Sequence, residues 1–223
     1  MSVNIREELK SRVTGPRMPQ RISAMIVACC FLGLGISFYV HASMGSDPFS
    51  TMNLGISSKI GWSFGTWQVL LNAVMLAAII FIDRSMLGLG TLGNMLLCGY
   101  SADFFNIFLD KLLPPTDEMS FAFRIVLTLI GVAMQLFGCS FYITADLGMA
   151  PYDCIAYIVQ DKTKIHFRVL RIILDCCTVA IGFACGASVG LGTIIMAFCT
   201  GPIIPVLNKY VAGPILKTEN VRT

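Results

Sequence analysis

Five long stretches of this sequence contain no Asp, Glu, Lys or Arg: residues 22–46, 60–82, 85–102, 125–145 and 176–208. A run of about 18 or more apolar residues is long enough to cross the hydrocarbon core of a bilayer as a helix. Charged residues make up only 13% of the chain, whereas soluble domains carry about 25%. The sequence therefore predicts an all-α integral membrane protein.

These stretches predict six full membrane spans, with a turn inside the last stretch. Gly186, Gly190 and Gly192 mark this turn, because the stretch is long enough for parts of two helices. The basic residues 1–21 and the first span have the order of a cleaved signal peptide. We expect this span to be retained, since the same segment recurs later in the chain, where no cleavage could occur. The predicted spans are residues 22–43, 64–82, 88–109, 122–144, 169–186 and 191–210.

The chain also contains an internal repeat. Shifted by 103 residues, GISFYVHASMGSDPF at 35–49 lies over GCSFYITADLGMAPY at 138–152 and shares Gly, Ser, Phe, Tyr, Ala, Gly and Pro with it. GLGT at 88–91 recurs at 190–193. The glycines of the repeated motifs are Gly45, Gly88, Gly90, Gly148, Gly190 and Gly192. The predicted organisation is a basic cytoplasmic segment 1–21, a first membrane repeat 22–111, a loop 112–121, a second membrane repeat 122–210 and a cytoplasmic tail 211–223.

Each repeat contains a segment that is too short to cross the membrane. Asp47–Lys59 and Pro151–Lys162 would be about 20 Å long as helices, against about 30 Å of hydrocarbon. We expect re-entrant or interfacial helices. Ser and Asp are favourable N-cap residues, and Pro is favourable in the first turn of a helix. A carboxylate at a helix start lies near the positive end of the helix dipole. The residues at the two starts are Ser46, Asp47, Pro48, Pro151 and Asp153.

Two membrane topologies follow from the short segments. If they do not cross, the repeats are inverted, and the excess of Lys and Arg places both termini in the cytoplasm. If each of them crosses, the chain has eight spans and the repeats are parallel. The distribution of Lys and Arg slightly favours parallel repeats, whereas the length of the short segments favours inversion. We adopt inversion, because short segments with polar interruptions make poor spans.

Acidic residues at the two short-helix starts are the main candidates for a functional site. Transporters built from repeats bind substrates near the midplane, where broken helices end. A bare helix start attracts anions, but Asp47 and Asp153 shift this preference toward a cation, a proton or an amine group. Alternatively, each aspartate only caps its own helix. The candidate site for substrate or ion comprises Ser46, Asp47, Pro48, Asp103, Pro151, Asp153, Arg171 and Asp175.

Other polar residues inside the predicted spans have structural alternatives. Arg171 and Asp175 are four residues apart, so they lie on one helix face and either neutralise each other or take part in function. Tyr39 and Tyr142 are expected to be interfacial anchors. Gln135 is expected to form a hydrogen bond between helices.

The motifs MGSDPFSTMNLGISSKIGWSFGT and GLGT in the first half, with LGMAPYD, GLGT and Gly201-Pro202 in the second, resemble those of the YczE/YyaS/YitT-type bacterial membrane proteins. The resemblance covers nearly the whole chain after residue 20. It implies a six-helix protein of the bacterial inner membrane, in a family often described as permeases. It implies no catalytic residues.

Three functions are compatible with the sequence. We favour a small-solute transporter whose central site lies between the repeats. One alternative is a non-transporting membrane protein that assembles with or regulates a partner, including a substrate-binding subunit of a separate motor. The other is an intramembrane enzyme. This is the weakest of the three hypotheses, because no nucleophile–base spacing, metal cluster or cofactor fingerprint is present in the sequence.

The expected partners are the lipid bilayer and an unknown small solute or ion. The sequence leaves open whether the chain forms a homo-oligomer or binds a partner membrane protein. No nucleic-acid partner is expected, since the sequence has no patch of interleaved basic and aromatic residues. No cofactor or metal is expected either. The 9 cysteines form no C-x-x-C pair, so we expect them to be small apolar packing residues.

Overall fold

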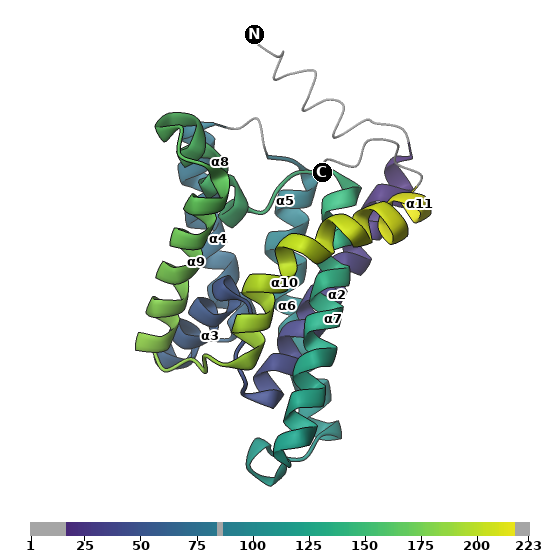
Figure 1. Ribbon diagram of the computed structural model, residues 1–223, viewed down its shortest axis with the longest axis vertical. Helices are drawn as coiled ribbons and strands as arrows, with labels where there is room; N and C mark the ends of the chain where they lie inside the picture. The colour runs from purple at the N-terminus through teal and green to yellow at the C-terminus, as the bar shows by residue number, and fades with distance from the viewer. Residues whose placement is uncertain (1–16, 84–86, 217–223) are drawn as a thin grey trace.

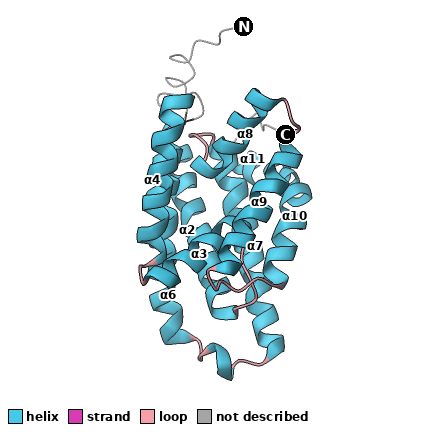
Figure 2. Cartoon of the chain, turned by 90° about the vertical axis from the view of Figure 1, so that its left-hand side faces the viewer, coloured by secondary structure: helices cyan, strands magenta, loops and turns pink. Residues whose placement is uncertain are grey.

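Helices are the only regular secondary structure in residues 17–83 and 87–216, the part of the chain that the structure, a computed structural model, describes (Figure 2). The predicted all-α class is confirmed for these residues. Residues 1–16, 84–86 and 217–223 lie outside this part of the chain. They include most of the predicted segment 1–21 and the end of the predicted tail 211–223. The elements are α2 (Met18–Ala42), α3 (Pro48–Ile60), α4 (Phe64–Ile82), α5 (Leu89–Gly93), η1 (Asn94–Cys98), α6 (Gly99–Leu112), η2 (Thr116–Glu118), α7 (Phe121–Ala145), α8 (Pro151–Thr163), α9 (Phe167–Ala184), α10 (Leu191–Leu207), η3 (Asn208–Ala212) and α11 (Gly213–Leu216).

Four helical segments are long and apolar enough to cross a membrane: α2, α4, α7 and the run Leu191–Leu216 that joins α10, η3 and α11. This run continues past residue 210, which is the predicted end of the second repeat. The other two predicted spans are also helical. One is the continuous run of α5, η1 and α6, and the other is α9, which carries Arg168, Arg171 and Asp175. That these two helices cross as well stays a prediction.

Helices α2 and α7 lie side by side and run in opposite directions along the molecule (Figure 1). Two arginines fix this arrangement. Arg21, near the start of α2, donates to the carbonyl oxygens of Ala145 and Asp146 at the end of α7. Arg124, near the start of α7, donates to the carbonyl oxygens of Ala42, at 2.7 Å, and Ser43, at 3.0 Å. Each guanidinium thus supplies donors and positive charge to the C-terminal end of the other helix, where the last carbonyls lack helical partners.

The short helices α3 and α8 begin inside the helix bundle, and their N-terminal ends face each other. The second residue of each is aromatic, and the rings of Phe49 and Tyr152 stack with their centroids 4.6 Å apart. From this contact the two helices lead away from each other (Figure 1). Helix α3 packs mainly on α9, and α8 packs on α4. Each short helix therefore contacts a long helix from the other half of the chain.

Helix α3 buries polar residues on the face that packs against the bundle. Ser50, Thr51, Asn53 and Ser57 are all buried. The hydroxyl of Thr51 donates to the carbonyl of Ser46 at 3.1 Å, and the side-chain amide of Asn53 donates at 2.8 Å to a backbone carbonyl of the same helix. These hydrogen bonds satisfy polar groups that are shielded from solvent. Whether α3 is re-entrant or interfacial stays a prediction.

The two GLGT segments form helix starts, and each packs on the glycine turn of the other half. Gly90 N–H donates to Leu147 O at 2.8 Å, and Gly192 N–H donates to Met44 O at 2.9 Å. The turn glycines have φ values of +86° at Gly45 and +123° at Gly148, a region that glycine adopts without strain. These paired contacts hold the chain in place just before each short helix begins.

Tyr39 and Tyr142 are buried, so the prediction that they are interfacial anchors is wrong. Their exposed fractions are 2% and 8%. The Tyr142 hydroxyl donates to Gly90 O at 3.2 Å, which ties it to the same packed turn. Tyr39 belongs to a buried cluster with Val132 and Leu136 of α7 and Met196 of α10, and Tyr142 belongs to a cluster formed largely by α2, so other long helices enclose both rings.

Candidate functional site

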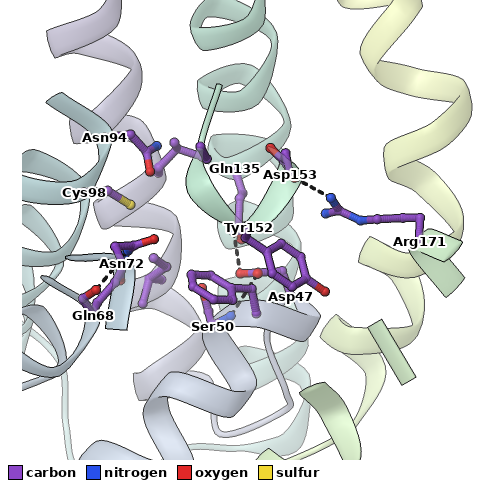
Figure 3. Close-up of a pocket in the computed structure, with 14 residues that line it drawn as sticks. Asp47, Ser50, Gln68, Asn72, Asn94, Cys98, Gln135, Tyr152, Asp153 and Arg171 are labelled. Atoms are coloured by element: carbon purple, nitrogen blue, oxygen red, sulfur yellow. Dashed lines mark hydrogen bonds and ion pairs between the residues drawn. The ribbon is translucent and has the colours of Figure 1, made fainter. Parts of the chain in front are cut away.

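A pocket of about 120 Å³ lies where the starts of α3 and α8 meet (Figure 3). It brings together three of the predicted site residues, Asp47, Asp153 and Arg171. They come from the start of α3, the first turn of α8 and α9. The residues that line the pocket are Leu32, Ile36, Asp47, Phe49, Ser50, Gln68, Asn72, Asn94, Cys98, Gln135, Ala150, Tyr152, Asp153 and Arg171.

Asp47 is the N-cap of α3, as the sequence predicts. One carboxylate oxygen accepts a hydrogen bond from the Ser50 backbone N–H at 3.0 Å. The other accepts from the side-chain amide of Gln135, which reaches across from α7 (Figure 3). Within the described ranges, no Lys, Arg or His forms an ion pair with Asp47. The aspartate is thus held by neutral donors alone among the described residues.

Asp153 belongs to a network of charged groups on the opposite side of the pocket. It forms an ion pair with Arg171, which lies in α9. The Nε of Arg171 also lies 3.3 Å from the carboxylate of Asp175, and its guanidinium carbon is 4.8 Å from the centroid of the Tyr152 ring. The Tyr152 hydroxyl donates to Asp175 at 2.7 Å. Two carboxylates and a phenol therefore surround one guanidinium.

Gln68 and Asn72 of α4 occupy the pocket wall across from this network (Figure 3). With the repeat shift of 103, they are the counterparts of Arg171 and Asp175. Both are buried, and the Asn72 side-chain amide donates to the backbone carbonyl of Gln68 at 2.9 Å. The amide oxygens of Gln68 and Gln135 have no hydrogen-bond partner among the described residues.

The remaining predicted site residues lie beside the pocket or away from it. The Ser46 hydroxyl is 2.9 Å from that of Thr51, and Pro48 and Pro151 occupy the first turns of their helices. Asp103 accepts from the Gly65 backbone N–H at 3.0 Å near the start of α4, and it does not line the pocket. The motif glycines stabilise the turns that precede α3 and α8.

Several residues that line the pocket are not among the predicted site residues: Phe49, Gln68, Asn72, Asn94 and Gln135. One signal pointed to Gln135, since it is the only amide side chain in the uncharged stretch 125–145. A lone polar group in such a helix is costly in a membrane and marks a contact or a site. Gln68 and Asn72 carry the same signal in the stretch 60–82.

The site offers groups that bind a small polar molecule: carboxylates, amides and an aromatic pair. In residues 17–83 and 87–216, no cluster of three or more His, Cys, Asp or Glu side chains could hold a metal ion. His41 Nε2 lies 3.0 Å from the carboxylate of Asp110, and neither residue lines the pocket.

Comparison with known proteins identifies the family. The profile of a family of unknown function, DUF6198, matches residues 19–209. The chain belongs to this family. It is 29% identical over 191 residues to an uncharacterized protein of Haemophilus influenzae, which covers 86% of this chain and 84% of that protein. It is 26% identical to the uncharacterized membrane protein YczE of Bacillus subtilis, over 78% of each chain.

A third relative is the uncharacterized protein YyaS of Bacillus subtilis, 25% identical over 83% of this chain and 90% of that protein. No solved structure matches the chain. The resemblance to YczE-type membrane proteins is thus confirmed. Together with the long apolar helices, it establishes the protein as a multi-pass integral membrane protein.

Proposed function

We propose that the protein is a transporter of a small solute and that the pocket between α3 and α8 is its substrate site. One observation carries this proposal: the N-terminal ends of two short helices meet at a polar pocket inside the bundle. In secondary transporters, discontinuous helices end near the midplane and form the substrate site in this way. Irregular backbone at that depth is tolerated where it is buried in protein or lines a wet cavity.

The paired contacts of the two halves support an inverted repeat, which is a common plan of such transporters. α2 and α7 are antiparallel, and Arg21 and Arg124 make equivalent contacts at opposite ends of this pair. The backbone bonds of Gly90 and Gly192 are equivalent as well. Parallel repeats would place Arg21 and Arg124 at the same end of the pair. In an inverted pair, one half rocking against the other would expose the pocket to each side of the membrane in turn.

The inverted arrangement is tested by labelling single cysteines with a membrane-impermeant thiol reagent in a cysteine-free background. Ser58, near the end of α3, and Asp161, near the end of α8, are both exposed. Inversion places them on opposite sides of the membrane, with Asp161 and both termini in the cytoplasm. Labelling of both positions from one side would contradict it.

Transport itself is tested with purified protein in liposomes, by screening small solutes for saturable flux. Ala150 lines the pocket at the start of α8, so Ala150→Trp should fill the site and abolish flux while the protein still accumulates and melts cooperatively. The matched control is Ala184→Trp, at the exposed end of α9, which should transport normally. Flux that is unchanged in Ala150→Trp would show that the pocket is not the site. No flux with any solute would favour a non-transporting partner protein.

A further inference from the structure

Two residues that line the pocket each carry a buried hydrogen-bond acceptor without a donor. The side-chain oxygens of Gln68 and Gln135 have no partner in the part of the chain that is described, and these residues are only 4% and 5% exposed. A buried acceptor without a donor is destabilising. A ligand in the pocket that donates hydrogen bonds would satisfy each oxygen once the amide turns toward it.

Asp47 adds a charged acceptor to the same pocket. A carboxylate offers about four acceptor positions, and Ser50 and Gln135 occupy only two of those on Asp47. Asp153 differs, because it forms an ion pair with Arg171, which it shares with Asp175. Asp47 is thus the carboxylate of the pocket that has free acceptor positions and no ion pair with Arg171.

The charge at the meeting point of the helices favours a cation. Asp47, Asp153 and Asp175 with Arg171 sum to −2 when ionised. The N-terminal ends of α3 and α8 contribute about +0.5 each through their dipoles. The site thus keeps roughly one negative charge, so an anion would be repelled even though two helix starts face it.

Size and lining restrict the cation further. A volume of about 120 Å³ is somewhat smaller than an apolar cavity of about 150 Å³ that holds benzene, so only a small ligand fits. Leu32, Ile36 and Phe49 form an apolar part of the wall. An ammonium group has three donors, which matches the acceptors on Gln68, Gln135 and Asp47. We infer that the pocket binds a small alkylammonium cation, with its charged end at Asp47 and its alkyl part against this apolar wall.

The inference rests on the proposed function, because it identifies the class of solute that the transporter would carry. Binding is nevertheless tested separately from transport. Thermal unfolding of the detergent-purified protein is followed with ethylammonium chloride, sodium chloride, sodium acetate and ethanol at fixed pH and ionic strength. A ligand that binds the folded state raises the melting temperature in a saturable way. We expect this effect with ethylammonium alone.

Variants connect the effect to the pocket. Asp47→Asn keeps the helix cap, since Asn caps about as well as Asp, but removes the charge, so affinity for ethylammonium should fall at least about tenfold. Gln68→Met keeps the shape and removes one acceptor, so it should also weaken binding while the ligand-free protein melts close to wild type. Asp161→Asn, on the exposed end of α8, is the matched control and should bind normally.

The outcomes separate the two proposals. Stabilisation by acetate, or by sodium as strongly as by ethylammonium, overturns the ammonium inference. So does wild-type binding by both Asp47→Asn and Gln68→Met. Ethylammonium binding without flux of any amine in liposomes supports the binding site and overturns transport. Saturable flux of another solute, without ethylammonium binding, supports transport and overturns the inference.

Discussion

The two halves of the molecule place different side chains on equivalent positions around one pocket. In the second half, Arg171 and Asp175 form an ionic network with Asp153. In the first half, the counterparts Gln68 and Asn72 are neutral amides, and Gln68 keeps a free acceptor. The difference teaches that similar helix contacts in the two halves can surround a pocket with unlike walls, an ionic network on one side and neutral amides on the other.

The framework around the pocket is much more symmetric than its lining. The arginine contacts at the ends of α2 and α7 are paired, and so are the backbone bonds of Gly90 and Gly192. Positions that set backbone geometry are thus alike in the two halves, whereas positions that face the pocket differ. This is expected when folding constrains the former and ligand chemistry constrains the latter.

The largest effect on the free energy of unfolding is expected when Arg171 is replaced by glutamine, the residue at the equivalent position of the first half. Arg171→Gln leaves Asp153 and Asp175 without their cation. Both ion pairs are only partly buried, and the loss of two charge-assisted hydrogen bonds of this kind costs about 3 kcal/mol in total. The free energy of unfolding, measured by titration with a denaturing detergent, should fall by about this amount. The triple change Asp153→Ser, Arg171→Gln and Asp175→Asn gives the second half the neutral residues of the first. It should recover most of the loss, and a triple variant as unstable as Arg171→Gln would contradict the comparison.

A somewhat smaller effect is expected at the paired glycine turns. Gly45→Ala and Gly148→Ala would place a Cβ 2.5 Å from the backbone N of Gly190 and 2.7 Å from that of Gly88. With the added strain of a positive φ, each should cost at least about 2 kcal/mol in the same titration. Gly186→Ala is the control, because its φ is +95° and its Cβ would meet nothing within 4 Å. Equal losses in all three would show that the turn contacts do not matter.

The arginines at the ends of α2 and α7 should have nearly equal effects. Arg21→Met and Arg124→Met each remove charged hydrogen bonds to helix-terminal carbonyls, worth about 1.5 kcal/mol. Arg21 also lies 3.6 Å from the half-exposed carboxylate of Asp146, an interaction that adds little at such exposure. Melting temperatures of the two variants should therefore match. A loss confined to one of them would break the symmetry of the framework.

The sequence predicts the local features of this site well and its long-range contacts poorly. Pro48 and Asp47 mark the start of α3 by their own backbone preferences, which act within a few residues. The bond between Gln135 and Asp47 and the stacking of Phe49 on Tyr152 join distant parts of the chain. Such contacts depend on how the helices pack, and no spacing rule in the sequence encodes them.

The same limit explains the wrong prediction for the tyrosines. Tyr39 lies close to the predicted end of a span, a position typical of interfacial anchors. In the structure Tyr39 is buried in a cluster with Val132 and Leu136 of α7 and Met196 of α10. Which face of a helix meets its neighbours depends on how the helices pack, and the hydropathy of the long helices alone does not reveal it.

The smallest effect is expected from neutralising Asp47, and it is informative next to the same change at Asp153. Asp153→Asn removes half of the charge around Arg171 and should lower the free energy of unfolding by about 1–2 kcal/mol. Asp47→Asn keeps the acceptor for Ser50, and a rotation of the Gln135 amide restores the other hydrogen bond, so the loss should stay below about 1 kcal/mol. Capping is tested by Asp47→Ala, because Asn still caps the helix whereas Ala removes the acceptor for the Ser50 backbone N–H. Denaturant titrations of the three variants decide this: a loss for Asp47→Asn as large as that for Asp153→Asn would mean that the charge of Asp47 is paired in the folded protein as strongly as that of Asp153.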